Sequence, residues 1–169
     1  MIIREEKPKE RNTVNELIRE AFLTAEHAKG NEHELVAALR ESDAFIPELS
    51  LVAEIDGAIA GHTLFTKGKV GEETVLILYP VSVAFSMKGH GTGGAMILAG
   101  QRIARKLGYK YIVVLGSNTY FPRLGYRPAS DFGIEPPPGV APEYYQAIQL
   151  DKQAPKLAGP VIYPEPFGI

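Results

Sequence analysis

The stretch KGHGTGG, from Lys88 to Gly94, places four glycines within seven residues. The run before it, TVLILYPVSV (74–83), is apolar and rich in β-branched side chains, which predicts a strand. After it, apolar residues and a glycine recur with helical spacing at Met96, Ala99, Gly100, Ile103, Ala104 and Leu107. Gly108 is then placed as a C-terminal helix cap. The glycines therefore mark a turn from a strand into a helix.

A turn of this kind can hold an anion. A helix N-terminus leaves about four backbone N–H groups unpaired and carries roughly half a positive charge, so it attracts a phosphate. Without Cβ atoms, Gly89, Gly91 and Gly93 can adopt positive φ angles and turn successive amides toward one point. Lys88 adds a cation at the rim, and His90 adds a further donor. A tight turn without a ligand is the alternative, but it requires fewer glycines.

Residues 89–94 also read as G-x-G-x-x-G, which is found in dinucleotide sites. A nicotinamide or flavin fold carries this motif in its first βα unit, with an acidic residue about 20 positions later. Here the motif lies in mid-chain, and the next predicted strand ends in VVLGSN (113–118) without an acid. A nucleotide-hydrolysing loop needs its lysine after the glycines, whereas Lys88 precedes them. The sequence therefore disfavours both of these sites.

Pro80 interrupts the strand that leads into the glycine turn. Proline removes one donor from the hydrogen-bond ladder, so we expect this strand to bulge or to splay away from its neighbour. A gap would then open beside the turn, lined by the free backbone groups of Val81, Ser82 and Val83. An extended ligand arm with its own amide groups could pair there like an added strand.

The N-terminal part of the chain predicts one short strand and two helices. Residues 2–3 predict the strand, and the apolar spacing over 14–25 predicts the first helix. Asn31 and Glu34 form an N-cap and N3 pair of the capping-box kind. They predict the start of a second helix that ends near Arg40.

Three antiparallel strands are predicted next. Residues 49–55 and 58–67 are β-rich runs joined by Asp56-Gly57, a strong hairpin signal. A second turn, KGKVGEE (67–73), leads into the strand at 74–83.

After the glycine turn and its helix, YKYIVVLG (109–116) predicts a strand that is buried on both faces. A turn of helix is expected around 120–124, and YYQAIQL (144–150) predicts a late strand. The PPPG segment (136–139) and the Pro-rich end from Pro155 predict irregular surface or edge segments.

Composition limits the possible functions. With 169 residues, 45% of them hydrophobic and 22% charged, the chain predicts one globular domain. Since it has no long apolar run and no apolar leader, we expect a cytoplasmic protein without a membrane span. The absence of cysteine excludes disulfides, thiolate metal sites and cysteine nucleophiles, and the histidines show no metal-binding spacing. A net charge of -2 without a basic cluster disfavours nucleic acid as the partner and favours a small molecule or peptide.

A pyrophosphate at the turn and an amide-bearing arm between splayed strands describe coenzyme A, and here the sequence resembles the GNAT superfamily of N-acetyltransferases. The family motif [QR]-x-x-G-x-[GA] matches KGHGTG (88–93), with Lys88 in place of glutamine or arginine. Three further segments resemble a bacterial branch of predicted acetyltransferases: Gly61-His62, YFPRLGY (120–126) and FGIEPPPGV (132–140). The resemblance covers most of the chain.

The resemblance implies an α/β (α+β) fold whose mixed central sheet has antiparallel N-terminal strands, splayed fourth and fifth strands and flanking helices. Residues 1–150 would form a single acetyltransferase domain, and residues 151–169 a Pro-rich extension packed on it. The implied reaction moves an acetyl group from acetyl-CoA to a primary amine of a small molecule or peptide, by direct attack in a ternary complex. A homodimer is compatible with the family. The implied cofactor-binding residues are Val81, Ser82, Val83, Lys88, Gly89, His90, Gly91, Thr92, Gly93 and Gly94.

The sequence offers one candidate proton donor. The family often uses a tyrosine four residues before the glycine of its final motif, and here that position is Phe121, which cannot donate a proton. Tyr120 is the catalytic candidate, although a neighbouring residue on a helix points about 100° away. A packing role for Tyr120 and protonation of the thiolate by solvent are the alternatives.

The sequence assigns no single base, because the strand at 74–83 contains no carboxylate. Ser82 and Ser117 could orient a water, and His62 is expected to be a hydrogen-bonded strand residue. The acceptor-side candidates, each of which could instead be an exposed helix-end residue, are Glu26, His27, Glu32 and His33. These gaps leave a second hypothesis, a catalytically degenerate module that binds CoA or acyl-CoA. A nicotinamide-binding protein is a third.

Overall fold

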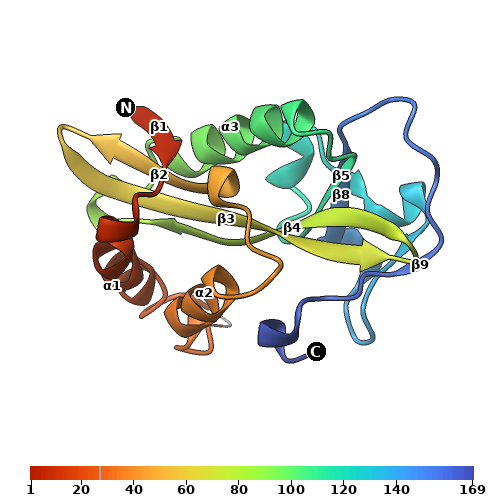
Figure 1. The fold of residues 1–169 in the computed structure, drawn as a ribbon, viewed down its shortest axis with the longest axis horizontal. Helices are drawn as coiled ribbons and strands as arrows, with labels where there is room; N and C mark the ends of the chain where they lie inside the picture. Colours follow the sequence, from red (N-terminus) through yellow and green to blue (C-terminus); the bar gives the residue numbers. More distant parts are fainter. Residues whose placement is uncertain (27) are drawn as a thin grey trace.

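The computed structural model, which describes residues 1–26 and 28–169, is built around a mixed seven-stranded sheet with helices on both faces (Figure 1). The strand order is β1-β2-β3-β4-β5-β8-β6. These strands are β1 (Ile2–Glu5), β2 (Ser50–Ile55), β3 (Ala58–Val70), β4 (Glu73–Val83), β5 (Tyr111–Leu115), β8 (Tyr145–Gln149) and β6 (Arg127–Pro128). A separate parallel pair joins β7 (Ile134–Glu135) to β9 (Gly159–Pro160).

In residues 1–26 and 28–169, three α-helices flank the sheet: α1 (Arg11–Ala21), α2 (Glu32–Arg40) and α3 (Thr92–Lys106). Short 3₁₀ turns connect the elements: η1 (Pro8–Glu10), η2 (Pro47–Leu49), η3 (Phe85–Met87), η4 (Phe121–Leu124), η5 (Ala129–Phe132), η6 (Pro142–Tyr144) and η7 (Glu165–Phe167). Helix α3 covers one face of the sheet, and α1 and α2 cover the other (Figure 1). Period-two alternation along the strands explains the two apolar surfaces: Leu51 and Phe65 pack toward α3, whereas Val52 and Leu64 pack toward α1 and α2.

The antiparallel strands predicted from residues 49 to 83 are confirmed. Asp56 and Gly57, with φ values of 51° and 80°, form the turn between β2 and β3. Gly71, with a φ of 58°, lies in the turn between β3 and β4. Strand β3 continues to Val70, beyond the predicted end, because residues 67–70 pair with the start of β4. The predicted first strand is also confirmed, as β1 pairs with β2 at the edge of the sheet.

The predicted irregularity at Pro80 is confirmed as both a bulge and a splay. Thr63 lies opposite Val81 and Phe65 opposite Leu78, so two residues of β4 face one residue of β3. The Tyr79-Pro80 peptide bond is cis. Among the described residues, strand β5 pairs with β4 only at Leu76–Ile112 and Ile77–Val113. Beyond these pairs β4 has no strand partner on the β5 side in the described part of the chain, which leaves part of its backbone available to a ligand.

The start of α2 differs from the sequence prediction in one local detail. Asn31 does occupy the N-cap position of α2, but its side chain makes no capping hydrogen bond. Instead the Glu32 carboxylate accepts hydrogen bonds from the backbone amides of Lys29 (2.8 Å) and Gly30 (3.2 Å). The carboxylate therefore holds the preceding turn in place, because it reaches backward from the first turn of the helix.

Residues 151–169 run back along the sheet face that α1 and α2 share (Figure 1). Leu157 and Val161 are buried there, and Ile162 makes an antiparallel bridge with Lys69. Phe167 packs between the apolar cluster under α1 and α2 and the cluster over β4, β5 and β8. The expected irregular end is thus one short strand, β9, and a chain held by buried apolar residues.

Candidate active site

The glycine turn forms the start of α3. Gly91 is the N-cap residue in the left-handed region, with a φ of 78°, and Gly89 has a φ of 82°. Gly93 was also predicted to adopt positive φ, but it lies inside the first helical turn and does not. Ala95 donates a backbone hydrogen bond to the Gly91 carbonyl (3.0 Å), whereas in the described chain the amides of residues 89–94 have no backbone acceptor. These free amides, together with the positive end of the helix dipole, create an anion-binding turn.

A cavity of about 380 Å³ opens beside this turn. It brings together Val81, Val83, Lys88, Gly89, Gly91, Thr92, Gly93 and Gly94, which sequence analysis had selected for the cofactor, and Tyr120. Ala21, Phe22, Ala25 and Met87 also line it. Sequence analysis did not select these four residues, because apolar and small residues near a helix end carry no motif. The cavity therefore lies between the end of α1, the end of β4 and the start of α3.

Two predicted cofactor residues lie outside the cavity lining. Ser82 is the cross-strand neighbour of His62 and is buried, so its side chain faces away from those of Val81 and Val83. In the described structure its hydroxyl has no hydrogen-bond partner. His90 is exposed on the glycine turn. For these two residues, only the backbone is placed to contribute to the site.

Lys88 supplies the positive charge at the rim. Its ammonium lies 5.6 Å from the centre of the Phe85 ring, which is 81% exposed. A cation held near an aromatic face at the mouth of the cavity can still reach a bound phosphate, because the lysine side chain is long and flexible.

Tyr120 and Phe121 point in different directions. The Tyr120 hydroxyl lies against α3, 3.3 Å from the position that a Cβ atom would take at Gly94. Phe121 is buried in the core, with its ring packed against the backbone of Gly116. Tyr120 precedes the η4 turn, and its amide donates to the Ser117 hydroxyl (3.1 Å). The Tyr120 phenol therefore reaches the cavity, in agreement with the sequence prediction. Phe121, which occupies the position of the family tyrosine, is a core residue.

Burial raises the pKa of Tyr120, and the Arg123 guanidinium, 5.8 Å from the ring centre, lowers it in part. The net shift is upward, so the phenol is protonated at neutral pH and can donate a hydrogen bond or a proton. Ser117, a candidate for orienting a water, instead uses its oxygen to accept from the amides of Thr119 and Tyr120. It fixes the turn that carries the tyrosine.

None of the base candidates in the described chain lines the cavity. Glu26 is exposed, and His27 lies outside the described residues. Glu32 is buried and binds the backbone of the preceding turn, while His33 is half-buried on α2. Among the described lining residues, Lys88 and Tyr120 are the titratable ones. The cavity thus contains a proton donor but no carboxylate or imidazole.

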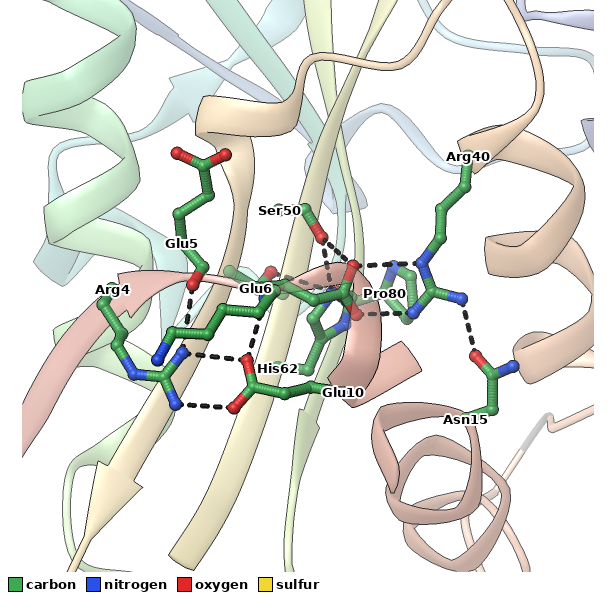
Figure 2. Close-up of polar contacts among 11 residues, drawn as sticks. Arg4, Glu5, Glu6, Glu10, Asn15, Arg40, Ser50, His62 and Pro80 are labelled. Carbon is green, nitrogen blue, oxygen red and sulfur yellow. Dashed lines mark hydrogen bonds and ion pairs between the residues drawn. The ribbon is translucent and has the colours of Figure 1, made fainter. Parts of the chain in front are cut away.

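His62 is a hydrogen-bonded strand residue, as expected, and belongs to a buried polar network (Figure 2). Arg40 donates to Glu6 through Nε (3.1 Å) and through the terminal NH2 nitrogen (2.6 Å). Ser50 donates its hydroxyl to Glu6 (3.0 Å), so its oxygen must accept from His62 Nε2 (3.0 Å). Burial, with a smaller contribution from Arg40, lowers the pKa of His62 to about 3, and the ring is neutral.

This network links five elements. Glu6 follows β1, Arg40 ends α2, Ser50 begins β2 and His62 lies in β3. Arg40 also donates to the Asn15 side chain of α1 (2.7 Å). The network ties α2 to α1, and the end of α1 borders the cavity. Sequence analysis did not find it, because its members are far apart along the chain.

Two further arginines contribute elsewhere. Arg123 lies over the Tyr120 ring, and Arg127 pairs with Asp131 (3.1 Å) near the far edge of the sheet. In the described chain no helix is both long and apolar enough to cross a membrane, and no group of three or more potential metal ligands gathers.

Comparison with known proteins identifies this arrangement. The acetyltransferase (GNAT) family model matches residues 12–126. Escherichia coli YjhQ, described as an uncharacterized N-acetyltransferase, is 37% identical over 123 residues, covering 70% of this chain and 68% of YjhQ.

Two solved structures resemble most of the chain. The GNAT-family N-acetyltransferase YhbS from Escherichia coli, in complex with CoA, has a TM-score of 0.88 and 26% identity, covering 99% of this chain and 92% of YhbS. A GNAT-family acetyltransferase from Brucella melitensis, in complex with acetyl-CoA, has a TM-score of 0.82 and 32% identity, covering 98% and 97%. The glycine turn, the splayed strands and the element order therefore have a common explanation: the chain belongs to the GNAT family of acetyltransferases.

Proposed function

We propose that this acetyltransferase moves the acetyl group of acetyl-CoA to a primary amine of a small molecule or peptide, by direct attack in a ternary complex. One observation carries the proposal: free amides of the glycine turn, the unpaired side of β4 and the Tyr120 hydroxyl meet at one cavity. The family makes acetyl-CoA the acyl donor, and the YhbS and Brucella structures hold CoA and acetyl-CoA.

The residues present fit coenzyme A. The free amides of residues 89–94 suit its pyrophosphate, with Lys88 as a nearby cation. The backbone of residues 81–83 can pair with the amides of the pantetheine arm, because β5 has already separated from β4. Acetyl-CoA supplies an activated thioester, and the protein supplies its orientation.

Catalysis by the protein rests on position and on hydrogen-bond donors. Holding amine and thioester together contributes up to about 7–11 kcal/mol in favourable cases. A free β4 amide is suited to stabilise the oxyanion, and the Tyr120 O–H to protonate the departing thiolate. The amine must lose a proton, and because the described cavity residues include no carboxylate or imidazole, we assign that step to water.

A degenerate CoA-binding module is the second candidate, favoured by the missing base. The position of Tyr120 argues against a degenerate module, because its protonated phenol faces the cavity next to Gly94. Release of free CoA from acetyl-CoA in the presence of an amine panel separates the two. A nicotinamide site would instead require binding of NADH.

Calorimetric titration with acetyl-CoA, CoA and NADH tests the proposal. The sharpest variant is Gly93→Val, because a Cβ atom at Gly93 lies 3.6 Å from Val81 and 3.8 Å from the Tyr120 hydroxyl. The two methyl groups of the valine would occupy the cavity. Gly93 does not have a positive φ, so its backbone conformation can accept a valine. Leu98→Val, in the same helix but 40% exposed, is the matched control.

We expect acetyl-CoA and CoA to bind the wild type and the Leu98→Val control with affinities within about twofold of each other. Gly93→Val should weaken both ligands by at least about tenfold, or about 1.4 kcal/mol, without lowering the unfolding midpoint by more than the control does. If neither CoA species binds the wild type, the acetyltransferase assignment of this site fails.

A further inference from the structure

The open end of the β4–β5 splay has a distinct composition on the face opposite α3. The last pair between the strands joins Ile77 to Val113. Two residues further along each strand lie Tyr79 and Leu115, on the same face as Ile77 and Val113, since side chains alternate along a strand. Tyr79 packs against the same apolar cluster as Ile77, and Leu115 pairs with Tyr145 on β8. Three apolar or aromatic side chains therefore stand where the strands separate.

Two residues of the C-terminal segment connect Tyr79 to Tyr145. Phe167 of η7 lies 6.2 Å from Tyr79, measured between ring centres, and 5.3 Å from Tyr163. The Tyr163 and Tyr145 hydroxyls are hydrogen-bonded at 2.7 Å. Tyr79, Phe167, Tyr163 and Tyr145 thus form a continuous row of rings from β4 to β8, which we call the aromatic bridge.

Apolar surface is left uncovered next to the bridge. Leu115 is 57% exposed although it ends a strand whose other residues are buried. Tyr79 and Phe167 are half-buried, so their rings also reach the surface in part. Burial raises the pKa of Tyr79, with a smaller contribution from the Glu32 carboxylate, and the phenol is therefore neutral beside a negative charge. Exposed apolar area, aromatic rings and a nearby carboxylate together suit a cation with an apolar body.

We propose that the aromatic bridge and Leu115 receive the acceptor, and that the acceptor is a primary amine carried on an aromatic or extended apolar framework. The inference rests on the proposed function, in which the thioester is held between β4 and β5. The acceptor would then approach this thioester from the sheet face opposite α3. The framework packs on Leu115 and the rings, while its ammonium group arrives beside Tyr79 before it loses a proton. Polar amines of the same length gain none of this contact.

Steady-state acetylation of phenethylamine and ethanolamine, at saturating acetyl-CoA, tests the substrate class. We expect kcat/KM for phenethylamine to be at least about tenfold higher. Leu115→Lys should raise the KM for phenethylamine about tenfold, through lost apolar contact and like-charge repulsion, and leave the KM for acetyl-CoA unchanged. Leu107→Lys, at a position 44% exposed on the other face, is the matched control. Because Leu115 is exposed, this variant keeps the test independent of folding.

Phe167→Ala and the conservative Phe167→Leu test the bridge itself, with Ile169→Ala, 77% exposed in the same segment, as the control. Phe167→Ala should raise the phenethylamine KM about tenfold, and Phe167→Leu should recover part of that loss. Equal kcat/KM values for the two amines, or an unchanged phenethylamine KM in Leu115→Lys, would overturn the inference while the acetyltransferase function stands. Failure of acetyl-CoA to bind in calorimetry would instead overturn the function on which it rests.

Discussion

At the scale of single residues, the neighbours Tyr120 and Phe121 show how a family motif can mislead by one position. Sequence counting places the family tyrosine at Phe121, yet this ring fills the core against Gly116. The 3₁₀ turn directs the preceding side chain to the cavity instead. Motif spacing predicted the segment correctly, but the direction of each side chain depends on the turn that Ser117 holds.

Tyr120→Phe removes the hydroxyl and keeps the ring. We expect kcat to fall about 100-fold, the lower end of the range for general acid catalysis, while the acetyl-CoA Kd changes by less than about twofold. Because the pKa of Tyr120 is raised, wild-type kcat should show no alkaline decline below about pH 10. The surface variant Tyr144→Phe is the control. A kcat for Tyr120→Phe equal to that of the wild type would assign thiolate protonation to solvent.

His62 links stability to pH. Its pKa falls from 6.5 to about 3 in the folded protein, so the unfolded chain binds more protons between these values. Stability is therefore fully present above about pH 6.5 and is lost as the pH falls toward 3. Between pH 7 and pH 5 we expect His62 to lower the unfolding free energy by about 2 kcal/mol. Denaturant titrations of the wild type and of His62→Gln at both pH values measure this change in unfolding free energy.

The Gln side chain retains an N–H donor for Ser50 and does not titrate, so the pH dependence should flatten in His62→Gln. The exposed His90→Gln provides the comparison for loss of a solvated histidine. If the unfolding free energy changes equally with pH in the wild type and in His62→Gln, His62 is not the source of the pH dependence.

At the scale of elements, sequence patterns with a short range were reliable. Alternation and the Asp56-Gly57 signal predicted the antiparallel strands, and Pro80 predicted where β4 leaves its neighbour. Glycine spacing located the anion-binding turn, although it assigned positive φ to Gly93, which is helical. The N-cap of α2 was placed correctly, but the choice between the Asn31 and Glu32 side chains depends on the path of the preceding loop.

Helix α3 reaches the sheet through Gly100. A Cβ atom there would lie 2.2 Å from two carbons of the Phe65 ring, so the helix and β3 are too close for any side chain. Gly100→Ala gains about 1 kcal/mol of helix propensity but must overpack this contact, so we expect a net loss of about 1–2 kcal/mol in unfolding free energy. Urea titration measures it.

The double variant Gly100→Ala with Phe65→Leu supplies the matched control, because the smaller side chain makes room for the added methyl group. Its loss in unfolding free energy should be smaller than the sum of the losses in the two single variants. Strict additivity would show that Gly100 and Phe65 do not share a steric limit.

At the scale of the whole molecule, the buried network connects parts of the chain that no local pattern relates. Glu6 and Arg40 are 8% and 7% exposed, so neither charge can be satisfied by solvent alone. Arg40→Leu leaves the Glu6 carboxylate buried without its ionic partner, and we expect a loss of about 3–5 kcal/mol in unfolding free energy. Arg19→Leu, which breaks the exposed pair with Glu16, should cost less than about 1 kcal/mol.

Adding Glu6→Gln to Arg40→Leu removes the uncompensated charge and should recover part of the loss. If Arg40→Leu costs no more than Arg19→Leu, the network does not hold the helices. Such long-range sets, like the aromatic bridge, could not be predicted from the sequence, because they depend on how distant segments meet on one face of the sheet.

The last strand of the sheet, β6, sets a limit on how the protein can meet copies of itself. It is two residues long, Arg127 and Pro128, and the proline has no N–H group to offer. An edge of this kind cannot template a further strand, and its charged residue disfavours close stacking of another backbone. Growth of the sheet from chain to chain, as in fibrils, is therefore blocked on this side. Any assembly of the enzyme that uses this side must form through side-chain surfaces.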